Sequence, residues 1–126
     1  MKESRSAAAR RGVESERLAA AFLEARGLAV LERNFRCRLG ELDLVCADRG
    51  VLVCVEVRQR SGVEFGGALA SITAAKRRRI VRAAAVFLAG SRRWRHSALR
   101  FDVIAVQGRP EAAHEIIWVR DAFQAG

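Results

Sequence analysis

Two acidic residues, Asp43 and Glu56, lie in neighbouring apolar runs that are joined by a short polar turn. Residues 40–47 and 51–58 are rich in Leu, Val and Cys, and the turn contains an Asp and a Gly. Apolar runs separated by such a turn predict a β-hairpin. The second run is apolar on both faces as far as Glu56, which is typical of a central strand in a sheet that is covered on both sides.

The number of residues in the turn decides whether the two carboxylates share a face, because side chains alternate along a strand. A turn of two or four residues places Asp43 and Glu56 on one face, whereas a turn of three separates them. We expect an even number. Arg58 alternates with Glu56 and therefore lies on the same face.

Two neighbouring buried acids repel each other, and a divalent cation relieves this repulsion. Mg²⁺ favours sites built from one or two carboxylates, a backbone carbonyl, water and a substrate phosphate. The residues alone also allow a second interpretation, in which strand-end acids are simply paired with arginine.

The chain of 126 residues has the length of one domain and carries a formal net charge of +9, mostly from arginine. This charge predicts a polyanionic partner. We expect nucleic acid as this partner, and no membrane. An anionic membrane surface and simple solubility are the weaker alternatives.

The three cysteines, Cys37, Cys46 and Cys54, are odd in number and have no CxxC spacing. They are typical of small buried residues in a reducing compartment. No apolar run is long enough to span a bilayer, and the N-terminus lacks the apolar core of a secretion signal. We therefore expect a cytoplasmic protein.

We expect residues 1–11 to form a disordered basic arm and residues 12–126 to form a single domain. Periodicity predicts helices over residues 13–26 and 73–89, the second with Thr73 as its N-cap, and glycines predict a mobile loop over residues 62–67. Further strands are predicted over residues 29–36, 100–106 and 115–119. The order helix, three strands, helix, two strands implies an α/β fold with a mixed central sheet of about five strands, flanked by helices.

Basic residues crowd the first half of the second predicted helix, where the helix dipole disfavours each cation by about 0.3–1 kcal/mol. They are Lys76, Arg77, Arg78, Arg79 and Arg82, and the nearby Arg92, Arg93 and Arg95 extend the basic surface. Phosphates would supply the missing negative charge. The alternative is a solvated basic face. Trp94 is expected to anchor its loop rather than stack on a base.

The string from Gly40 to Arg58, the following Phe65-Gly66-Gly67, Lys76, and Arg100-Phe101-Asp102-Val103 resemble the YraN family of endonuclease-like proteins. The resemblance spans about residues 16–123. That family is assigned to the restriction-endonuclease-like fold of PD-(D/E)xK nucleases and is similar in layout to archaeal Holliday junction resolvases. The resemblance implies a restriction-endonuclease-like core and a Mg²⁺- or Mn²⁺-dependent endonuclease of DNA, including branched or damaged DNA.

In that superfamily the site is formed by an acid on the first helix, an Asp on the first hairpin strand and an acid-x-Lys on the next strand. By position the pattern corresponds to Glu16, Asp43, Glu56 and Arg58, with the carbonyl of Val57 as a further metal ligand. The resemblance implies that Asp43 and Glu56 hold a metal that activates water and stabilises the scissile phosphate. Glu16 would orient the water or hold a second metal, or is merely an exposed helix residue.

Arg58 stands where the superfamily usually has lysine. Arginine stays protonated and cannot act as a general base, although it can bind a phosphate oxygen. Activity would then require that the metal alone activates water, or that Lys76 reaches the site. Ser15 replaces the family's glycine before the helix acid, and Asp102 is expected to have a structural role, paired with arginine.

Three interpretations therefore remain open: a metal-dependent endonuclease, a nucleic-acid-binding protein that keeps the nuclease fold without turnover, and a basic accessory protein of an RNA or membrane assembly. Metal dependence would separate them. Junction resolvases act as dimers, so a homodimer is conceivable, but no self-complementary patch is evident in the sequence.

Overall fold

The computed structural model describes residues 5–60, 66–110 and 112–125. Along the chain the elements are α1 (Arg5–Ala25), β1 (Ala29–Cys37), β2 (Gly40–Asp48), β3 (Val51–Arg60), α2 (Gly66–Ala70), α3 (Ala74–Ala89), β4 (Leu99–Gly108) and β5 (His114–Phe123). The strands form one sheet in the order β1-β2-β3-β4-β5. Only the β3–β4 pair is parallel among these neighbours, so the expected α/β fold with a mixed five-stranded sheet is confirmed and is consistent with a restriction-endonuclease-like core.

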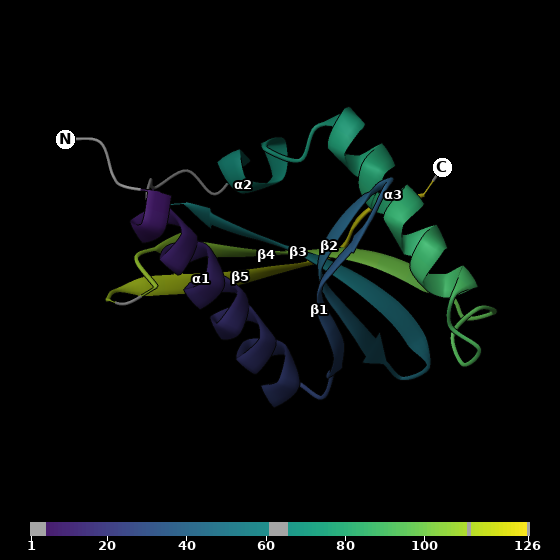
Figure 1. The fold of residues 1–126 in the computed structure, drawn as a ribbon. Coiled ribbons are helices and arrows are strands. Elements are labelled where there is room, and N and C mark those ends of the chain that lie inside the picture. The colour runs from purple at the N-terminus through teal and green to yellow at the C-terminus, as the bar shows by residue number, and fades with distance from the viewer. Residues whose placement is uncertain (1–4, 61–65, 111, 126) are drawn as a thin grey trace.

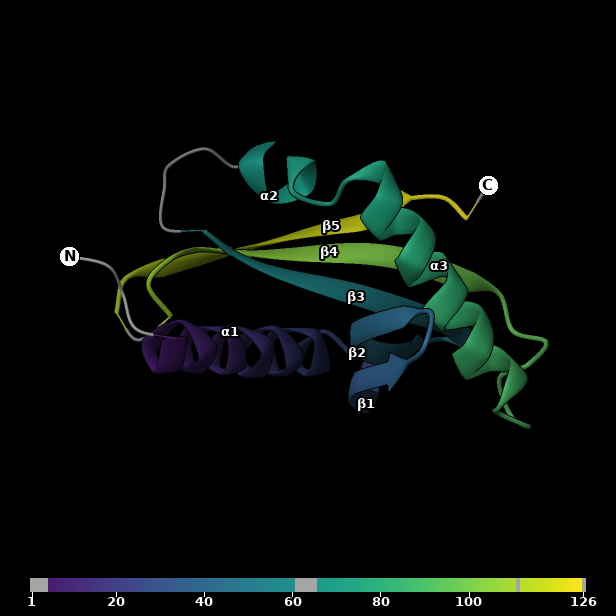
Figure 2. The same cartoon turned by 45° about the horizontal axis from the view of Figure 1, so that its top comes forward.

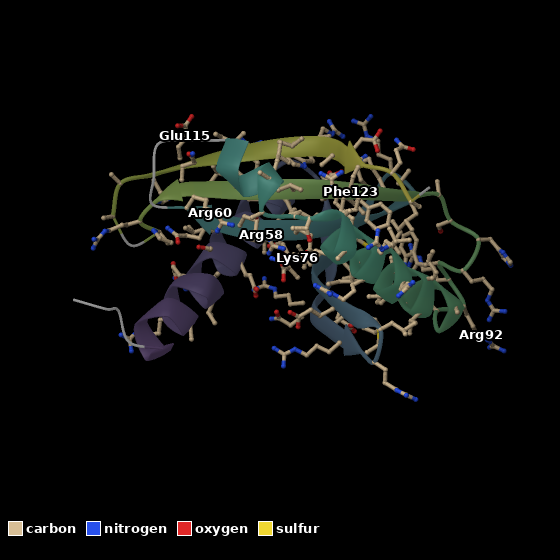
Figure 3. All side chains as sticks on the ribbon, turned by 90° about the horizontal axis from the view of Figure 1, so that it is seen from above. Arg58, Arg60, Lys76, Arg92, Glu115 and Phe123 are labelled. Carbon is tan, nitrogen blue, oxygen red and sulfur yellow. The ribbon has the colours of Figure 1, made fainter. Side chains whose placement is uncertain are left out.

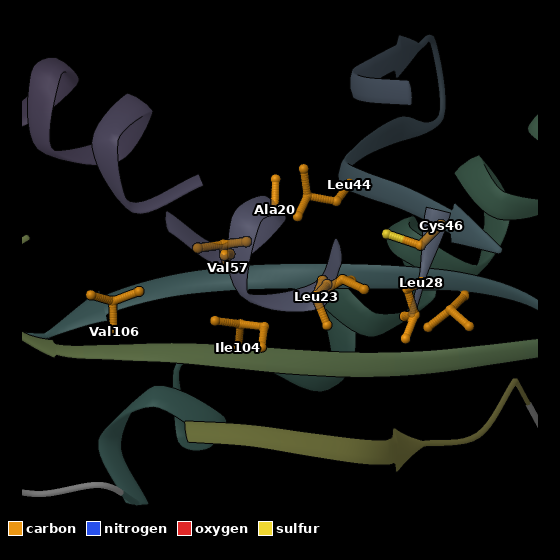
Figure 4. Packing of buried hydrophobic residues seen from close by; sticks show 11 residues of the cluster. Ala20, Leu23, Leu28, Leu44, Cys46, Val57, Ile104 and Val106 are labelled. Carbon is orange, nitrogen blue, oxygen red and sulfur yellow. The ribbon is translucent and has the colours of Figure 1, made fainter. Parts of the chain in front are cut away.

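Helices cover both faces of the sheet, with α1 on one side and α2 and α3 on the other (Figures 1 and 2). On the α1 side, Leu23 packs in a core with strand residues such as Val57 and Ile104 (Figure 4). On the α3 side, Ile80 and Cys54 belong to a second core. Because both faces of β3 are buried along most of its length, its expected place at the centre of the sheet is confirmed.

The turn between β2 and β3 contains two residues, Arg49 and Gly50, whose φ angles are 52° and 84°. Positive φ at both positions matches the right-handed twist of the flanking strands, which is why two-residue hairpin turns favour it. Asp48 pairs with Val51 on either side of the turn. The even-numbered turn is thus confirmed, and it sets the register that decides where the two acids lie.

The β1–β2 hairpin curls out of the sheet toward α3 (Figure 1). At its tip, a Cβ atom added to Gly40 would lie 2.7 Å from the carbonyl oxygen of Arg79 on α3. Real Cβ atoms do not approach oxygen so closely, so glycine is what permits this contact. The close approach brings the hairpin, the end of β3 and the first turns of α3 around a common space.

Two predicted segments differ from the structure. Helix α1 begins at Arg5, so it takes in most of the segment 1–11 for which we expected a disordered arm, and residues 1–4 lie outside the described part. Alanine and arginine, which favour helix, occupy much of residues 5–11. The predicted loop 62–67 overlaps helix α2, which begins at Gly66, while residues 61–65 are not described.

Helix α3 agrees closely with its prediction. The hydroxyl of Thr73 accepts a hydrogen bond of 3.2 Å from the backbone N–H of Lys76, which is the expected N-cap. The cap satisfies one of the free amides of the first turn, although no acidic residue lies in that turn. The helix therefore starts where expected, with its cations uncompensated by acids of its own first turn.

All three cysteines are free, and Cys46 and Cys54 are buried whereas Cys37 is half-buried. Burial raises the pKa of the Cys46 and Cys54 thiols to about 12, so both stay protonated at neutral pH. Among the described residues, no helix has both the length and the apolar character needed to cross a membrane. The cytoplasmic location stays a prediction.

Candidate active site

A cleft of about 700 Å³ opens between the β1–β2 hairpin, the end of β3 and the first turns of α3. Figure 3 shows the side chains of Arg58, Arg60 and Lys76 together in this region. The cleft lining includes six basic side chains and three acidic ones: Arg36, Arg38, Arg58, Arg60, Lys76 and Arg79, with Glu41, Asp43 and Glu56. Positive charge thus surrounds a small group of carboxylates.

Asp43 and Glu56 lie across from each other on neighbouring strands, as the two-residue turn requires. Each accepts a hydrogen bond from the opposite backbone: Oδ2 of Asp43 from the N–H of Val57 at 2.9 Å, and Oε2 of Glu56 from the N–H of Asp43 at 3.4 Å. The side chain of Asp43 is 16% exposed and that of Glu56 is 6% exposed. The hairpin backbone therefore holds both carboxylates at the floor of the cleft.

Burial raises the pKa of both acids. For Glu56, burial and then repulsion from Asp43 raise the pKa to about 8, and the charge of Arg58 offsets this only in part. For Asp43, burial raises the pKa, while the hydrogen bond from Val57 and the charge of Arg58 lower it. When the ionised forms of two adjacent acids are disfavoured in this way, the site lacks positive charge.

The guanidinium of Arg58 lies among three oxygen atoms. Its Nη1 is 3.3 Å from the carbonyl oxygen of Val57 and 3.7 Å from Oδ2 of Asp43, and its Nη2 is 3.5 Å from Oε1 of Glu56. Strong charge-assisted hydrogen bonds are about 2.7–2.9 Å long, so these contacts are loose. The buried Nε has no hydrogen-bond partner among the described residues. Arg58 therefore neutralises the acids without bonding tightly to any of them.

The three oxygen-bearing groups around Arg58 are the ones expected to hold a metal. Two carboxylates and a carbonyl are hard ligands of the type that Mg²⁺ and Mn²⁺ favour, and a cationic group already lies among them. Within the part of the chain that the structure describes, no three His, Cys, Asp or Glu side chains form a metal cage. A metal here would complete its shell with water and phosphate, as Mg²⁺ commonly does.

Glu16 lies beside this pair rather than in the cleft lining. It is half-buried on α1, and burial raises its pKa, followed by repulsion from Asp43, while a hydrogen bond with Asn34 lowers it. The carboxylate of Glu16 is thus close enough to Asp43 for electrostatic repulsion between the two. Its placement fits a supporting role better than direct coordination with Asp43 and Glu56.

Helix α3 presents its basic residues on two sides. Lys76 and Arg79 line the cleft, and Nζ of Lys76 donates a hydrogen bond of 3.3 Å to the carbonyl of Ser71. Three others line a separate hollow of about 680 Å³ beside Phe123: Arg77, Arg78 and Arg82. Of the predicted basic set, then, only Lys76 and Arg79 join the carboxylates.

The arginines that follow α3 lie further away. Arg92 is at the end of α3 remote from Arg58 (Figure 3), and Arg93 and Arg95 are exposed in the same segment. Trp94 packs against the core on the α3 side, with the guanidinium of Arg93 5.1 Å from its ring centre. Trp94 is thus the anchor that we expected.

Four cleft residues were missed by the sequence analysis: Arg36, Arg38, Glu41 and Arg60. Arg60 alternates with Arg58 along β3, and strand periodicity could have found it. The other three belong to the β1–β2 hairpin, and Arg36 pairs with Glu41 at 3.4 Å. They reach the cleft because the hairpin curls onto α3, which no local pattern reveals.

Asp102 has the structural role that we expected. It is fully buried and accepts hydrogen bonds from Nε and Nη2 of Arg100 at 2.9 and 3.0 Å. It also accepts bonds of 2.9 Å from Nε1 of Trp118 and from the backbone N–H of Asp121. This carboxylate therefore ties β4 to β5.

Comparison with known proteins shows the family of this chain. Residues 15–106 match a family described as "Uncharacterised protein family UPF0102". A UPF0102 protein of Halorhodospira halophila is 52% identical over 90% of this chain and 87% of its own. A second, from Nitrosomonas europaea, is 47% identical over 94% and 97% of the two chains. The chain belongs to the UPF0102 family, the YraN-like family that its motifs resemble.

Proposed function

We propose that the protein is a divalent-metal-dependent endonuclease of the PD-(D/E)xK superfamily that hydrolyses phosphodiester bonds in DNA. One observation carries the proposal: a buried pair of carboxylates, Asp43 and Glu56, lies at the floor of a cleft lined by six basic side chains. The acids offer ligands to a metal, and the basic walls offer contacts to a phosphate backbone.

The cleft residues would have two roles, metal binding and phosphate binding. Asp43, Glu56 and the carbonyl of Val57 would hold Mg²⁺ or Mn²⁺, which when bound supplies a more acidic water and stabilises charge on the phosphate. Lys76 and Arg79, on the α3 side of the cleft, would bind phosphate oxygens. The hydrogen bond that the backbone N–H of Val57 donates to Oδ2 of Asp43 would keep this carboxylate oriented for metal binding.

Arg58 would act as a cation rather than as a base. A guanidinium does not lose its proton near neutral pH, so it cannot remove one from water. It can donate two parallel hydrogen bonds to a phosphate. Lys76 is the lysine of the cleft, and its Nζ is engaged with the carbonyl of Ser71, so proton transfer through Lys76 would require that contact to break.

A second function is a nucleic-acid-binding protein without turnover. The position of the Arg58 guanidinium favours it, because an arginine already neutralises the groups that would hold the metal. In that case the cleft binds a phosphate backbone, and the carboxylates serve to order Arg58. DNA as the partner, rather than RNA, and a possible homodimer stay predictions under either function.

The test is a cleavage assay of purified wild type, Asp43→Ala and Glu56→Ala with Mg²⁺ or Mn²⁺, on linear, single-stranded and branched DNA. Wild type should cleave only with metal, and each variant should lose at least about 100-fold in rate, because a metal ligand stabilises the transition state directly. Glu115→Ala, which removes an exposed acid outside the cleft, is the matched control and should retain activity.

DNA binding provides the complementary measurement. The double variant Asp43→Ala, Glu56→Ala should bind DNA without metal at least as tightly as wild type, because it removes negative charge from a basic cleft. Binding without metal-dependent cleavage by wild type would establish the second function. Loss of binding in the double variant would refute the assignment of this cleft as the DNA site.

A further inference from the structure

We infer that Arg58 is a mobile counter-ion that couples metal binding to DNA binding, an inference that rests on the proposed function. In the free protein its guanidinium neutralises Asp43 and Glu56. When metal and DNA bind together, the guanidinium leaves these oxygens for a DNA phosphate. Each ligand therefore makes the other bind more tightly.

Arg58 and a bound metal would require the same oxygen atoms. The guanidinium contacts the carbonyl of Val57 and a carboxylate oxygen of each acid, which together form the expected protein ligand set. Two cations cannot share three oxygens at this spacing without strong repulsion. Metal binding thus requires Arg58 to move, and the free protein should bind metal weakly.

Arg58 also makes only weak hydrogen bonds in its present position. Its contacts to the two carboxylates are 3.5 and 3.7 Å long, and its buried Nε has no partner among the described residues. A buried donor without a partner is destabilising, so this placement of Arg58 carries a cost that a new partner would remove. A phosphate in the cleft could accept from Nε and a terminal nitrogen at once.

Another arginine of the same molecule shows what a fixed ion pair looks like. Arg100 makes two bonds of 2.9 and 3.0 Å to Asp102, using its Nε and Nη2, and it has a further contact of 3.1 Å with Asp48. Exposure of the two arginine side chains is nearly equal, 19% for Arg100 and 20% for Arg58. Different burial therefore does not explain the longer contacts of Arg58. Such contacts are expected of a side chain that changes partners when ligands bind.

A phosphate bound in the cleft would give the Arg58 guanidinium a new partner. Arg58 lines the cleft together with Lys76 and Arg79, so a phosphate held by those two residues would lie in the space that Arg58 faces. Movement of Arg58 toward that phosphate would free the carboxylates for metal. By linkage, DNA must raise metal affinity by the same factor by which metal raises DNA affinity.

The experiment measures Mn²⁺ affinity by electron paramagnetic resonance at pH 8, with and without a hydrolysis-resistant phosphorothioate duplex. Wild type should bind Mn²⁺ weakly alone and at least about tenfold more tightly with the duplex. Arg58→Met keeps an unbranched, flexible stem but removes the guanidinium and its charge, so it should bind Mn²⁺ at least about tenfold more tightly than wild type alone. With the duplex, this variant should gain less than about twofold.

Arg92→Met is the matched control, because Arg92 is exposed, lies outside the cleft and is remote from Arg58 (Figure 3). It should retain the coupling of wild type. Arg58→Lys guards against misfolding of the methionine variant: it keeps the charge but lacks the planar fork, and it should reduce the coupling without abolishing it.

A readout on wild type requires no substitution. In NMR spectra, the chemical shift of the ¹⁵Nε–H group of Arg58 should change when Mg²⁺ and the duplex are added together, because Nε gains a phosphate partner. Mg²⁺ replaces Mn²⁺ in this experiment because Mn²⁺ is paramagnetic. An unchanged resonance, or an Arg58→Met variant whose metal affinity and coupling equal those of wild type, would overturn the inference while leaving the nuclease proposal intact. Failure of every variant to bind metal, even with the duplex, would overturn both.

Discussion

At the scale of single residues, the protein contains two buried clusters of acid and arginine that are bonded very differently. Asp102 has four hydrogen-bond donors within 3.0 Å, and no cleft residue is among them. Asp43 and Glu56 share one loosely held guanidinium, and burial raises the pKa of each. A satisfied cluster stabilises the fold, whereas an undersatisfied one can receive a ligand.

The raised pKa of Glu56 predicts how stability changes with pH. Its pKa is about 8 in the folded protein against an ordinary value of 4.5, so the folded state binds more protons than the unfolded state between these values. Metal-free wild type should therefore lose stability as pH rises from 5 to 8, by an amount of the order of 3 kcal/mol. Glu56→Gln cannot ionise and should show a flatter profile. Urea unfolding at both pH values measures this, and parallel profiles would refute it.

The Asp102 cluster predicts a large loss of stability from a small change. Asp102→Asn removes the charge that Arg100 and Trp118 depend on, and it replaces one acceptor oxygen with an amide. We expect a loss of about 2–4 kcal/mol, because buried donors lose their partner. Asp121→Asn is the matched control: its side chain is exposed and Asn tolerates its φ of 51°, so the change should stay within about 0.5 kcal/mol. Equal effects in chemical unfolding would contradict the structural role.

At the scale of elements, the site depends on how the β1–β2 hairpin meets α3. The hairpin brings Arg36, Arg38 and Glu41 to the cleft, and α3 brings Lys76 and Arg79. The first turn of α3 contains no acid, so the dipole favours an external anion there. Neither element forms the cleft alone, and the two elements approach closely at Gly40.

Gly40→Ala tests that contact. The new Cβ would lie 2.7 Å from the carbonyl oxygen of Arg79, so the hairpin and α3 must separate, at a cost of about 1–3 kcal/mol. Gly12→Ala is the control, because no atom lies within 4 Å of its added Cβ and Gly12 is in the interior of α1. That change should stabilise by about 0.5–1 kcal/mol. Thermal unfolding compares the two, and a neutral Gly40→Ala would show that the contact is not tight.

At the scale of the whole molecule, positive charge is spread well beyond the cleft. The net charge of +9 includes arginines beside Phe123 and others after α3. Each basic residue that contacts a phosphate releases counterions, whereas a solvated one does not. Salt dependence can therefore distinguish the surface that touches DNA from the rest.

We predict a steep fall of DNA affinity with salt, and a difference between two matched double variants. Arg36→Ala, Arg79→Ala removes two cleft arginines and should lower the slope of log affinity against log salt by about 1–2. Arg92→Ala, Arg93→Ala removes the same charge at the remote end of α3 and should change the slope by less than about 0.5. Fluorescence anisotropy from 50 to 300 mM salt measures both, and equal slopes would place DNA elsewhere on the surface.

The local features of this protein were determined by its sequence. The strands, the N-cap at Thr73, the central place of β3 and the two-residue turn follow from alternation, capping and turn chemistry, which act over a few residues. The shared face of Asp43, Glu56 and Arg58 follows from the same register. The helical start of α1 was missed because low apolar content hid a segment of helix-forming residues.

The tertiary structure alone decided which charges meet. Arg36, Arg38 and Glu41 reach the carboxylates through a curled hairpin, and α3 sends Arg77, Arg78 and Arg82 to another hollow. The long contacts of the Arg58 guanidinium with three oxygen atoms likewise depend on the exact tertiary geometry. Such contacts join residues far apart in the chain, and their energies depend on burial and distance, which a linear pattern does not contain.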